Sequence, residues 1–173
     1  MTPQVWHGTR PHRTQPTGRR VAEDYKRKFL VVIDDSPECD RAVTFAAHRV
    51  NRTGGSVVLL TVIDTADFGQ FLGVGDVMRA EARAEAERNL DARIARINQI
   101  GTVRTETAIR EGRPAEEIEK LVAEDPGIAI LVLAAAAEGP GELVTHFTAH
   151  NKLHILVTIV PGAMTDEEIV AVA

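Results

Sequence analysis

Two adjacent carboxylates, Asp34 and Asp35, are the side chains whose type and position most clearly indicate chemistry. They follow an unbroken apolar run from Phe29 to Ile33, which is typical of a strand buried on both faces in a parallel sheet. A helix is expected to begin directly afterwards, with Ser36 as its cap and Pro37 at its first position. Ligands of parallel α/β proteins bind at the carboxyl ends of the strands, where loops lead from strands to helices. The pair therefore predicts an acidic crevice at the carboxyl edge of a sheet.

The other reactive side chains form no catalytic constellation. His146 and His150 have the spacing of two zinc ligands on one helix face, but no Cys lies near them and no H-E-x-x-H motif occurs. Cys39 is the only cysteine and has no His or Lys beside it in the sequence, so we expect a packed thiol. The sequence contains neither a G-x-S-x-G motif nor a Walker G-K-[ST] motif. These observations predict a protein that is not an enzyme and holds no metal.

Apolar segments alternate with helical patterns along the chain, and this alternation defines the fold class. The strands are predicted at residues 29–33, 57–63, 103–109, 128–137 and 155–160. Amphipathic stripes or helix-start signals separate each strand from the next. The order predicts a single α/β domain with a doubly wound, five-stranded parallel sheet and helices on both faces. The third strand alternates polar and apolar residues, as expected at a sheet edge.

Charge divides the chain into a basic arm and an acidic body. Residues 1–28 carry seven Lys or Arg and two Asp or Glu, whereas the remainder carries thirteen and twenty-three. The segment 1–27 has no hydrophobic period and is expected to be a disordered arm. The acidic body argues against nucleic acid as a partner.

No apolar run approaches the roughly 20 residues that span a bilayer, and the single cysteine suits a reducing compartment. We therefore predict a cytoplasmic protein that does not enter membranes.

Four short motifs occur in a fixed order within residues 28–162. They are Ile33-Asp34-Asp35-Ser36, Thr61-Val62-Ile63-Asp64, Glu111-Gly112-Arg113-Pro114 and Val160-Pro161. This set resembles the universal stress protein family, which has V-D-G-S after its first strand, H-V-x-D in its second, G-x-P at a helix start, and a proline that closes its last strand. We expect a domain of this family at residues 28–162.

The resemblance implies a flavodoxin-like strand order, 3-2-1-4-5. It also implies dimers that pair through the last strand, here Ile155 to Val160, and an ATP site between the first and fourth strands, which many members have. Asp34 matches the aspartate that contacts adenine in the family, and Val62 matches the residue whose backbone contacts the base. Asp35 is expected to face the same crevice. The resemblance thus assigns a nucleotide to the acidic crevice.

The phosphate-binding loop of the family is not intact in this sequence. ATP-binding members carry G-x-x-G and, further on, G-S or G-T after the fourth strand, and backbone amides of this loop hold the phosphates. Here only Glu138, Gly139 and Pro140 follow the strand. Gly141 and Glu142 then stand where the glycine and the hydroxyl residue are expected. Pro140 removes an amide donor, and the added carboxylates oppose a triphosphate. The motif is therefore degenerate.

The last residues, 163–173, carry a helix-start signal of their own. Thr165 and Glu168 have the spacing of a capping box, and three apolar side chains follow within residues 169–172. A helix this short is marginal by itself in water. We therefore expect a short capped helix or tail, docked on this subunit or on a dimer partner beside the surface that the shortened loop leaves.

These features predict a non-catalytic universal stress protein, a homodimer of the stress response without a tightly bound cofactor. Two alternatives stay open at this point. One is a nucleotide-binding member that holds ATP or AMP with Mg²⁺ through a remodelled loop. The other is a metal-dependent enzyme that uses the acidic crevice. The candidate crevice residues are Asp34, Asp35, Val62, Gly139, Gly141 and Glu142.

Overall fold

The computed structural model describes residues 27–65, 75–136, 138–150 and 152–173 and contains one five-stranded sheet in the order β3-β2-β1-β4-β5. Every pair of neighbouring strands is parallel, so the predicted fold class is confirmed. The predicted basic arm lies outside the described residues, except for Arg27. The strands are β1 (Lys28–Val32), β2 (Ser56–Ile63), β3 (Thr105–Glu111), β4 (Ile128–Ala135) and β5 (Leu156–Pro161).

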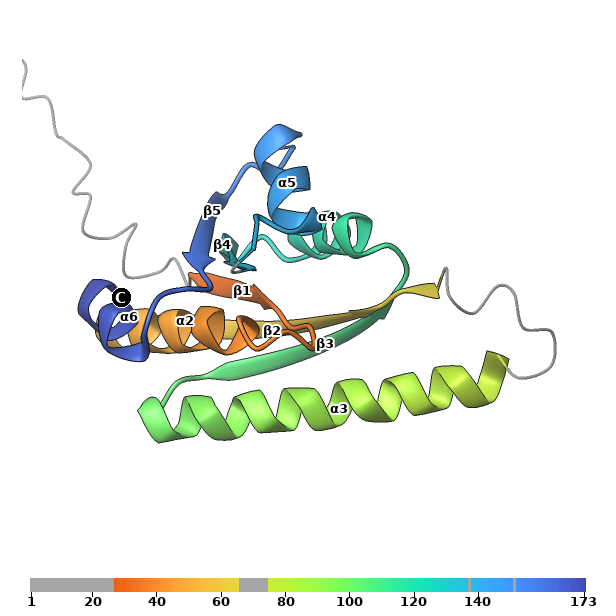
Figure 1. The fold of residues 1–173 in the computed structure, drawn as a ribbon, viewed down its shortest axis with the longest axis horizontal. Coiled ribbons are helices and arrows are strands. Elements are labelled where there is room, and N and C mark those ends of the chain that lie inside the picture. Colours follow the sequence, from red (N-terminus) through yellow and green to blue (C-terminus); the bar gives the residue numbers. More distant parts are fainter. Residues whose placement is uncertain (1–26, 66–74, 137, 151) are drawn as a thin grey trace, which may run out of the picture.

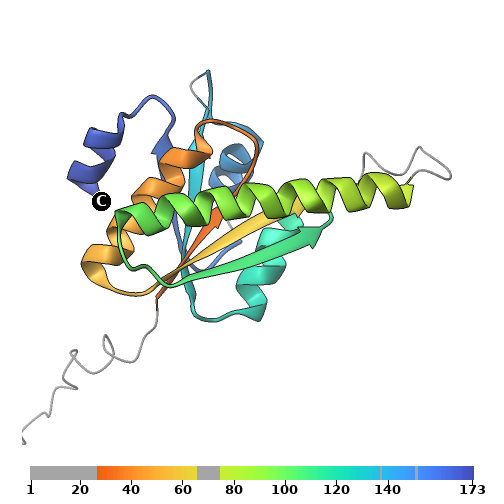
Figure 2. The same cartoon turned by 90° about the horizontal axis from the view of Figure 1, so that it is seen from below.

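Helices cover both faces of this sheet (Figures 1 and 2). One core cluster joins the sheet to α2, α3 and α6, and a second cluster joins it to α4 and α5. Among the described residues, no helix combines the length and the apolar character needed to cross a membrane. The helices are α2 (Cys39–Thr53), α3 (Gly75–Ile100), α4 (Pro114–Glu124), α5 (Glu142–Ala149) and α6 (Asp166–Val172).

The central strand β1 explains why its sequence is an unbroken apolar run. Phe29 and Val31 belong to the core cluster on the α2 face, whereas Leu30 and Val32 belong to the cluster on the α4 face. All four side chains are buried. A strand with neighbours at both edges and helices on both faces has no polar side to present, so its residues are all apolar.

The predicted start of α2 is wrong by two residues. The helix begins at Cys39 with Glu38 at the cap position, and no side chain there caps it. Ser36 instead donates from its backbone N–H (3.0 Å) and its Oγ (2.5 Å) to Oδ1 of Asp34. The carboxylate two residues earlier therefore holds Ser36 in a turn, an arrangement that competes with helix capping.

The C-terminal capping box is present, and the helix that it starts is docked. Thr165 Oγ1 accepts from the backbone N–H of Glu168 (3.3 Å), and Glu168 Oε2 accepts from that of Thr165 (2.9 Å). Ile169 is fully buried in the core cluster of the α2 face, so α6 packs against α2 (Figure 1). The expected position beside the loop after β4 is wrong, because the buried side chain finds its apolar partners on α2.

Candidate functional site

A crevice of about 210 Å³ lies at the carboxyl ends of β1 and β4. The sheet order reverses direction between these two strands, and this reversal is where open α/β sheets bind ligands. Apolar side chains form most of its walls, and the turn after β4 and the start of α5 form its rim. The lining residues are Val32, Asp34, Ser36, Leu133, Ala134, Ala136, Pro140, Gly141, Glu142, Leu143 and Val144.

Asp34 is held in the crevice by the turn that follows β1. Its Oδ1 accepts both hydrogen bonds of Ser36, the backbone N–H and the hydroxyl. The chain can make this turn because β1 ends at Val32 and α2 starts only at Cys39, which leaves an irregular segment between them. The turn therefore orients one carboxylate toward any ligand at this edge.

The loop after β4 is a tight turn. Ala136 and Gly139 form an antiparallel bridge, and the Gly139 N–H donates to the Ala136 carbonyl (3.4 Å). Gly139 has φ +155° and Gly141 has φ +76°, values that favour glycine. The chain enters α5 directly after Gly141, whose carbonyl accepts from the N–H (3.1 Å) and the Oγ1 (2.8 Å) of Thr145. Within this turn the Gly139 N–H is engaged and Pro140 has none, so the remaining donors on this side are amides at the start of α5.

The charges of the crevice do not favour an anion. Its lining includes the carboxylates of Asp34 and Glu142 but no Lys, Arg or His. The amino terminus of α5 provides a positive partial charge, but Glu142 is in its first turn and already complements it. Pro140 has no amide hydrogen to donate. A triphosphate would therefore meet two like charges, whereas a neutral or cationic group meets an acidic rim over an apolar floor.

The structure brings together only some of the predicted site residues. Asp34, Gly141 and Glu142 line the crevice. Asp35 is outside this lining and accepts a hydrogen bond from Asn89 Nδ2 of α3 (2.7 Å). Val62 packs, partly buried, against the core cluster of the α4 face, also outside the lining.

Gly139 completes the turn after β4 without lining the crevice, and the sequence did not single out the apolar walls. Leu133 of β4 and Leu143 of α5 stand on these walls, and both belong to the apolar cluster that joins the sheet to α4 and α5. The alternation of side chains along a strand was the available signal, but it is lost in a run that is apolar throughout.

Neither a reactive thiol nor a ready-made metal site accompanies the crevice in the described part of the chain. Burial raises the pKa of the Cys39 thiol, and its Sγ lies 3.8 Å from the carbonyl of Val32. A raised pKa keeps a thiol protonated and unreactive. Across the described ranges, no three or more His, Cys, Asp or Glu side chains are grouped so that they could hold a metal ion.

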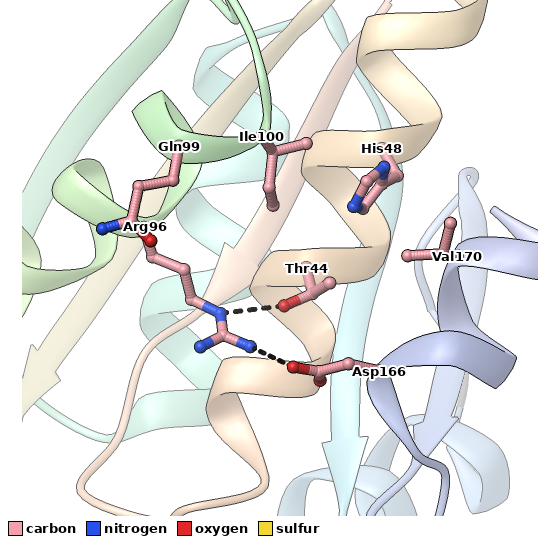
Figure 3. Close-up of a pocket in the computed structure, with 7 residues that line it drawn as sticks. All are labelled: Thr44, His48, Arg96, Gln99, Ile100, Asp166 and Val170. Carbon is pink, nitrogen blue, oxygen red and sulfur yellow. Dashed lines mark hydrogen bonds and ion pairs between the residues drawn. The ribbon is translucent and has the colours of Figure 1, made fainter.

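A second cavity, of about 220 Å³, lies between α2, α3 and α6 (Figure 3). Arg96 of α3 donates from Nε to Thr44 Oγ1 (2.9 Å) and pairs through an Nη atom with Asp166 Oδ2 (3.0 Å). These contacts join three helices, and His48 and Gln99 complete the polar wall. The guanidinium is thus engaged in holding α6 in place.

The strand order and the crevice at its switch point define a flavodoxin-like α/β protein with an acidic crevice at the carboxyl edge of its sheet. The model of the universal stress protein family matches residues 26–154. The chain therefore belongs to this family, as its motifs predict. No curated protein matches the chain.

Solved structures of this family are similar to the chain. UspA from Lactobacillus plantarum is 23% identical, covering 78% of this chain and 97% of that one with a TM-score of 0.66. A member from Burkholderia pseudomallei is 21% identical, covering 79% and 96% with a TM-score of 0.64. A member from Archaeoglobus fulgidus, solved in complex with dAMP, is 17% identical and covers 78% and 98% with a TM-score of 0.57. Because all three identities are low, at 17–23%, the similarity to these structures shows the fold alone.

Proposed function

We propose that the chain is a non-catalytic universal stress protein, a cytoplasmic homodimer whose degenerate nucleotide site does not bind ATP tightly. The tight turn after β4 carries this proposal. Its bridge between Ala136 and Gly139 leaves no extended loop to wrap a triphosphate. The acidic lining, without a cation, supports the same conclusion.

A second candidate is a member that binds a mononucleotide, because the crevice keeps one half of a nucleotide site. Asp34 remains at the switch point, above the apolar walls from Val32 and Leu133. The structural relative from A. fulgidus was solved with dAMP, a ligand with a single phosphate. One phosphate needs fewer donors than three, so AMP or cyclic AMP would suffer less from the short turn than ATP.

A thermal-shift series with ATP, AMP and cyclic AMP, each with and without Mg²⁺, separates these candidates. A ligand at about 100 times its Kd raises the free energy of unfolding by about 2.7 kcal/mol, so a specific ligand is readily detected. We expect no shift with millimolar ATP. A shift with AMP alone that disappears in Asp34→Asn would favour the second candidate. A low-micromolar Kd for ATP by calorimetry would defeat the proposal.

The metal-dependent enzyme has the least support from the described residues. Only two carboxylates line the crevice, those of Asp34 and Glu142. Mg²⁺ and Ca²⁺ prefer several oxygen ligands at defined positions. We therefore propose no catalytic role, and the Mg²⁺ arm of the same series tests this directly.

The proposed homodimer rests on β5, which lies at one edge of the sheet. Leu156 and Ile159 of this strand are exposed, Leu156 by 69%. An edge strand with exposed apolar side chains invites pairing with its own copy. We expect light scattering at tens of micromolar protein to give the mass of a dimer. Leu156→Lys should lower it toward a monomer, whereas Val172→Lys, at an equally exposed position of α6, should not. A monomeric parent protein would refute the dimer.

A further inference from the structure

An apolar groove of about 340 Å³ opens at the amino edge of the sheet, opposite to the crevice. Val122 and Ala123 of α4 form one side of it, and Ile128 at the start of β4 forms the floor. The segment before β5 closes the other side with Leu153 and Ile155. Apolar residues make up six of the nine that line it, so water is a poor occupant of this groove.

The described chain begins beside this groove. Lys28 is in register with Ile128, and its backbone N–H donates to the carbonyl of Gly127 (2.9 Å). Gly127 lies between two groove residues, Pro126 and Ile128. The arm, residues 1–26, therefore joins the described chain next to the start of β4, where Ile128 forms the groove floor. Almost all of this arm precedes the part that the family model matches, which starts at residue 26.

The composition of the arm complements the groove and the body. Trp6 and Tyr25 are the only tryptophan and the only tyrosine of the chain, and both are in the arm. Residues 1–26 carry five Lys or Arg and two Asp or Glu, whereas residues 27–173 carry fifteen and twenty-three. The arm therefore has a charge of +3 and the body −8, so the complementary charge belongs to the body as a whole, since Glu119 and Lys152 offset each other in the groove lining. Tryptophan is one of the side chains enriched among residues that anchor a partner in a well-packed pocket.

We propose that the arm of the same chain docks in this groove, with the Trp6 indole as its apolar anchor. Residues 7–26 form a tether of twenty residues, whose root-mean-square span is about 25 Å if it behaves as a flexible chain. A tether of that kind holds its end at an effective concentration of about a millimolar, so even a weak contact is populated. The basic residues of the arm then lie over the acidic body.

Trp6 reports on its own position, because no other tryptophan contributes to the emission of the chain. In the full-length protein we expect a blue-shifted emission maximum and slow quenching by acrylamide, compared with free N-acetyl-tryptophanamide. Emission and quenching equal to those of the free amide would overturn the proposal. Protection that fades on dilution would assign the occupant to a second copy and would overturn docking within one chain.

Ala123→Glu tests whether the groove is the docking site. Ala123 is exposed and lines the groove, so a carboxylate there should leave the fold intact but oppose a buried indole. We expect the ratio of docked to free arm to fall about tenfold or more. The matched control is Ala92→Glu at an exposed position of α3, which should keep the parent emission. Protection of Trp6 that survives Ala123→Glu would overturn the assignment to this groove.

Trp6→Ala gives an independent test that does not alter the folded domain. Amide chemical shifts of the parent and this variant, compared by NMR, should differ at Ala123, Ile128 and Ile155. They should be unchanged at the crevice, for example at Leu143. Perturbations that are absent, or that cluster away from the groove, would overturn the proposal.

Discussion

The two edges of the sheet use the same chemical groups in opposite ways. At the amino edge, Lys28 Nζ lies between two carboxylates, 2.7 Å from Glu106 Oε2 and 2.8 Å from Asp125 Oδ2. At the carboxyl edge, Asp34 and Glu142 line a crevice whose lining includes no cation. The first arrangement ties the starts of β1 and β3 to the turn before β4, whereas the second pairs neither carboxylate with a cation of the crevice lining.

The comparison shows where this chain places its cations. The side-chain hydrogen bond to Asp125, and then that to Glu106, raises the pKa of Lys28, and the bond from Lys28 lowers the pKa of Asp125. Arg52 near the same edge donates to two carbonyls of the C-terminal segment. Cations near the amino edge thus stabilise the fold, whereas the crevice that would need them for a phosphate has none. We infer that this domain is built for structural integrity at one edge and for weak or no anion binding at the other.

Gly55→Ala should have the largest effect, because the amino edge is also where backbone segments approach most closely. Gly55 has φ +114°, and a Cβ there would lie 2.3 Å from the Arg27 carbonyl oxygen. We expect a loss of about 3 kcal/mol or more in the free energy of unfolding, measured by urea denaturation. The control at this edge is Gly54→Ala, where φ is +77° but nothing lies within 4 Å, with a loss of about 1 kcal/mol.

Gly139→Ala supplies the matching measurement at the carboxyl edge. Its φ of +155° lies at the limit of the left-handed region, and a Cβ would meet nothing within 4 Å. A loss as large as that of Gly55→Ala would contradict the view that the crevice turn is structurally open.

Arg52→Ala should have the next largest effect. Its two Nη atoms donate to the carbonyls of Ala173 (2.6 Å) and Val170 (2.8 Å), and both bonds are lost together. Hydrogen bonds from a charged group stabilise a fold more than neutral ones do, but exposure to solvent reduces this stabilisation. We therefore expect the free energy of unfolding to fall by about 1–2 kcal/mol. Arg49→Ala, at an exposed position on the same helix, is the control and should change stability by less than about 0.5 kcal/mol. Equal effects of the two variants would show that α6 is not held by Arg52.

The strands and helices were predictable from the sequence because their signals are local, whereas the strand order followed from the resemblance to the family. β1 and β4 are apolar runs, and the capping box of α6 is complete within four residues. Boundaries were less accurate where a pattern continues past an element. The third strand was predicted at residues 103–109 and lies at Thr105–Glu111, because alternation in an edge strand does not mark its ends. The predicted start of α2 was inaccurate because Ser36 is hydrogen-bonded to Asp34 and does not cap the helix.

The candidate site was predictable where its residues follow strands that the topology places side by side. Asp34, Gly141 and Glu142 follow strand ends, and topology alone brings them to one crevice. Asp35 was expected to face it too, but its partner Asn89 is 54 positions away on α3. A contact at that separation leaves no periodic trace in a single sequence.

Asp125→Asn tests the ion pairs of the amino edge through pH. The folded pKa of Asp125 is lowered from its ordinary 3.8, so its contribution is present above that pH and is lost as the pH falls through the folded pKa. Near neutral pH we expect the variant to be less stable by about 1 kcal/mol, since both partners are partly exposed. The amide side chain of the variant keeps an oxygen for the Gly127 N–H, which Asp125 Oδ1 now binds at 2.9 Å.

The difference in the free energy of unfolding between the parent and Asp125→Asn, measured with urea, should therefore disappear below about pH 4. At the alkaline end, the raised pKa of Lys28 means that the parent keeps this contribution until the pH exceeds 10.5. A gap that stays constant down to about pH 2 would show that the effect is not electrostatic.

Glu142→Gln should have the smallest effect on stability and is the sharpest test at the carboxyl edge. Glu142 is exposed in the first turn of α5, where its charge gains a few tenths of a kcal/mol from the helix dipole but faces Asp34 across the crevice. These terms oppose each other, so we expect a change within about 0.5 kcal/mol.

The informative measurement on this variant is ATP binding by calorimetry, because the substitution removes charge without changing the backbone. The turn between Ala136 and Gly139 and the missing amide of Pro140 remain in Glu142→Gln. If the backbone limits phosphate binding, the variant still does not bind ATP tightly. A low-micromolar Kd in this variant alone would show that the carboxylate is the obstacle. The difference between the two edges would then reduce to one charge at the start of α5, and the short turn would be compatible with a phosphate site.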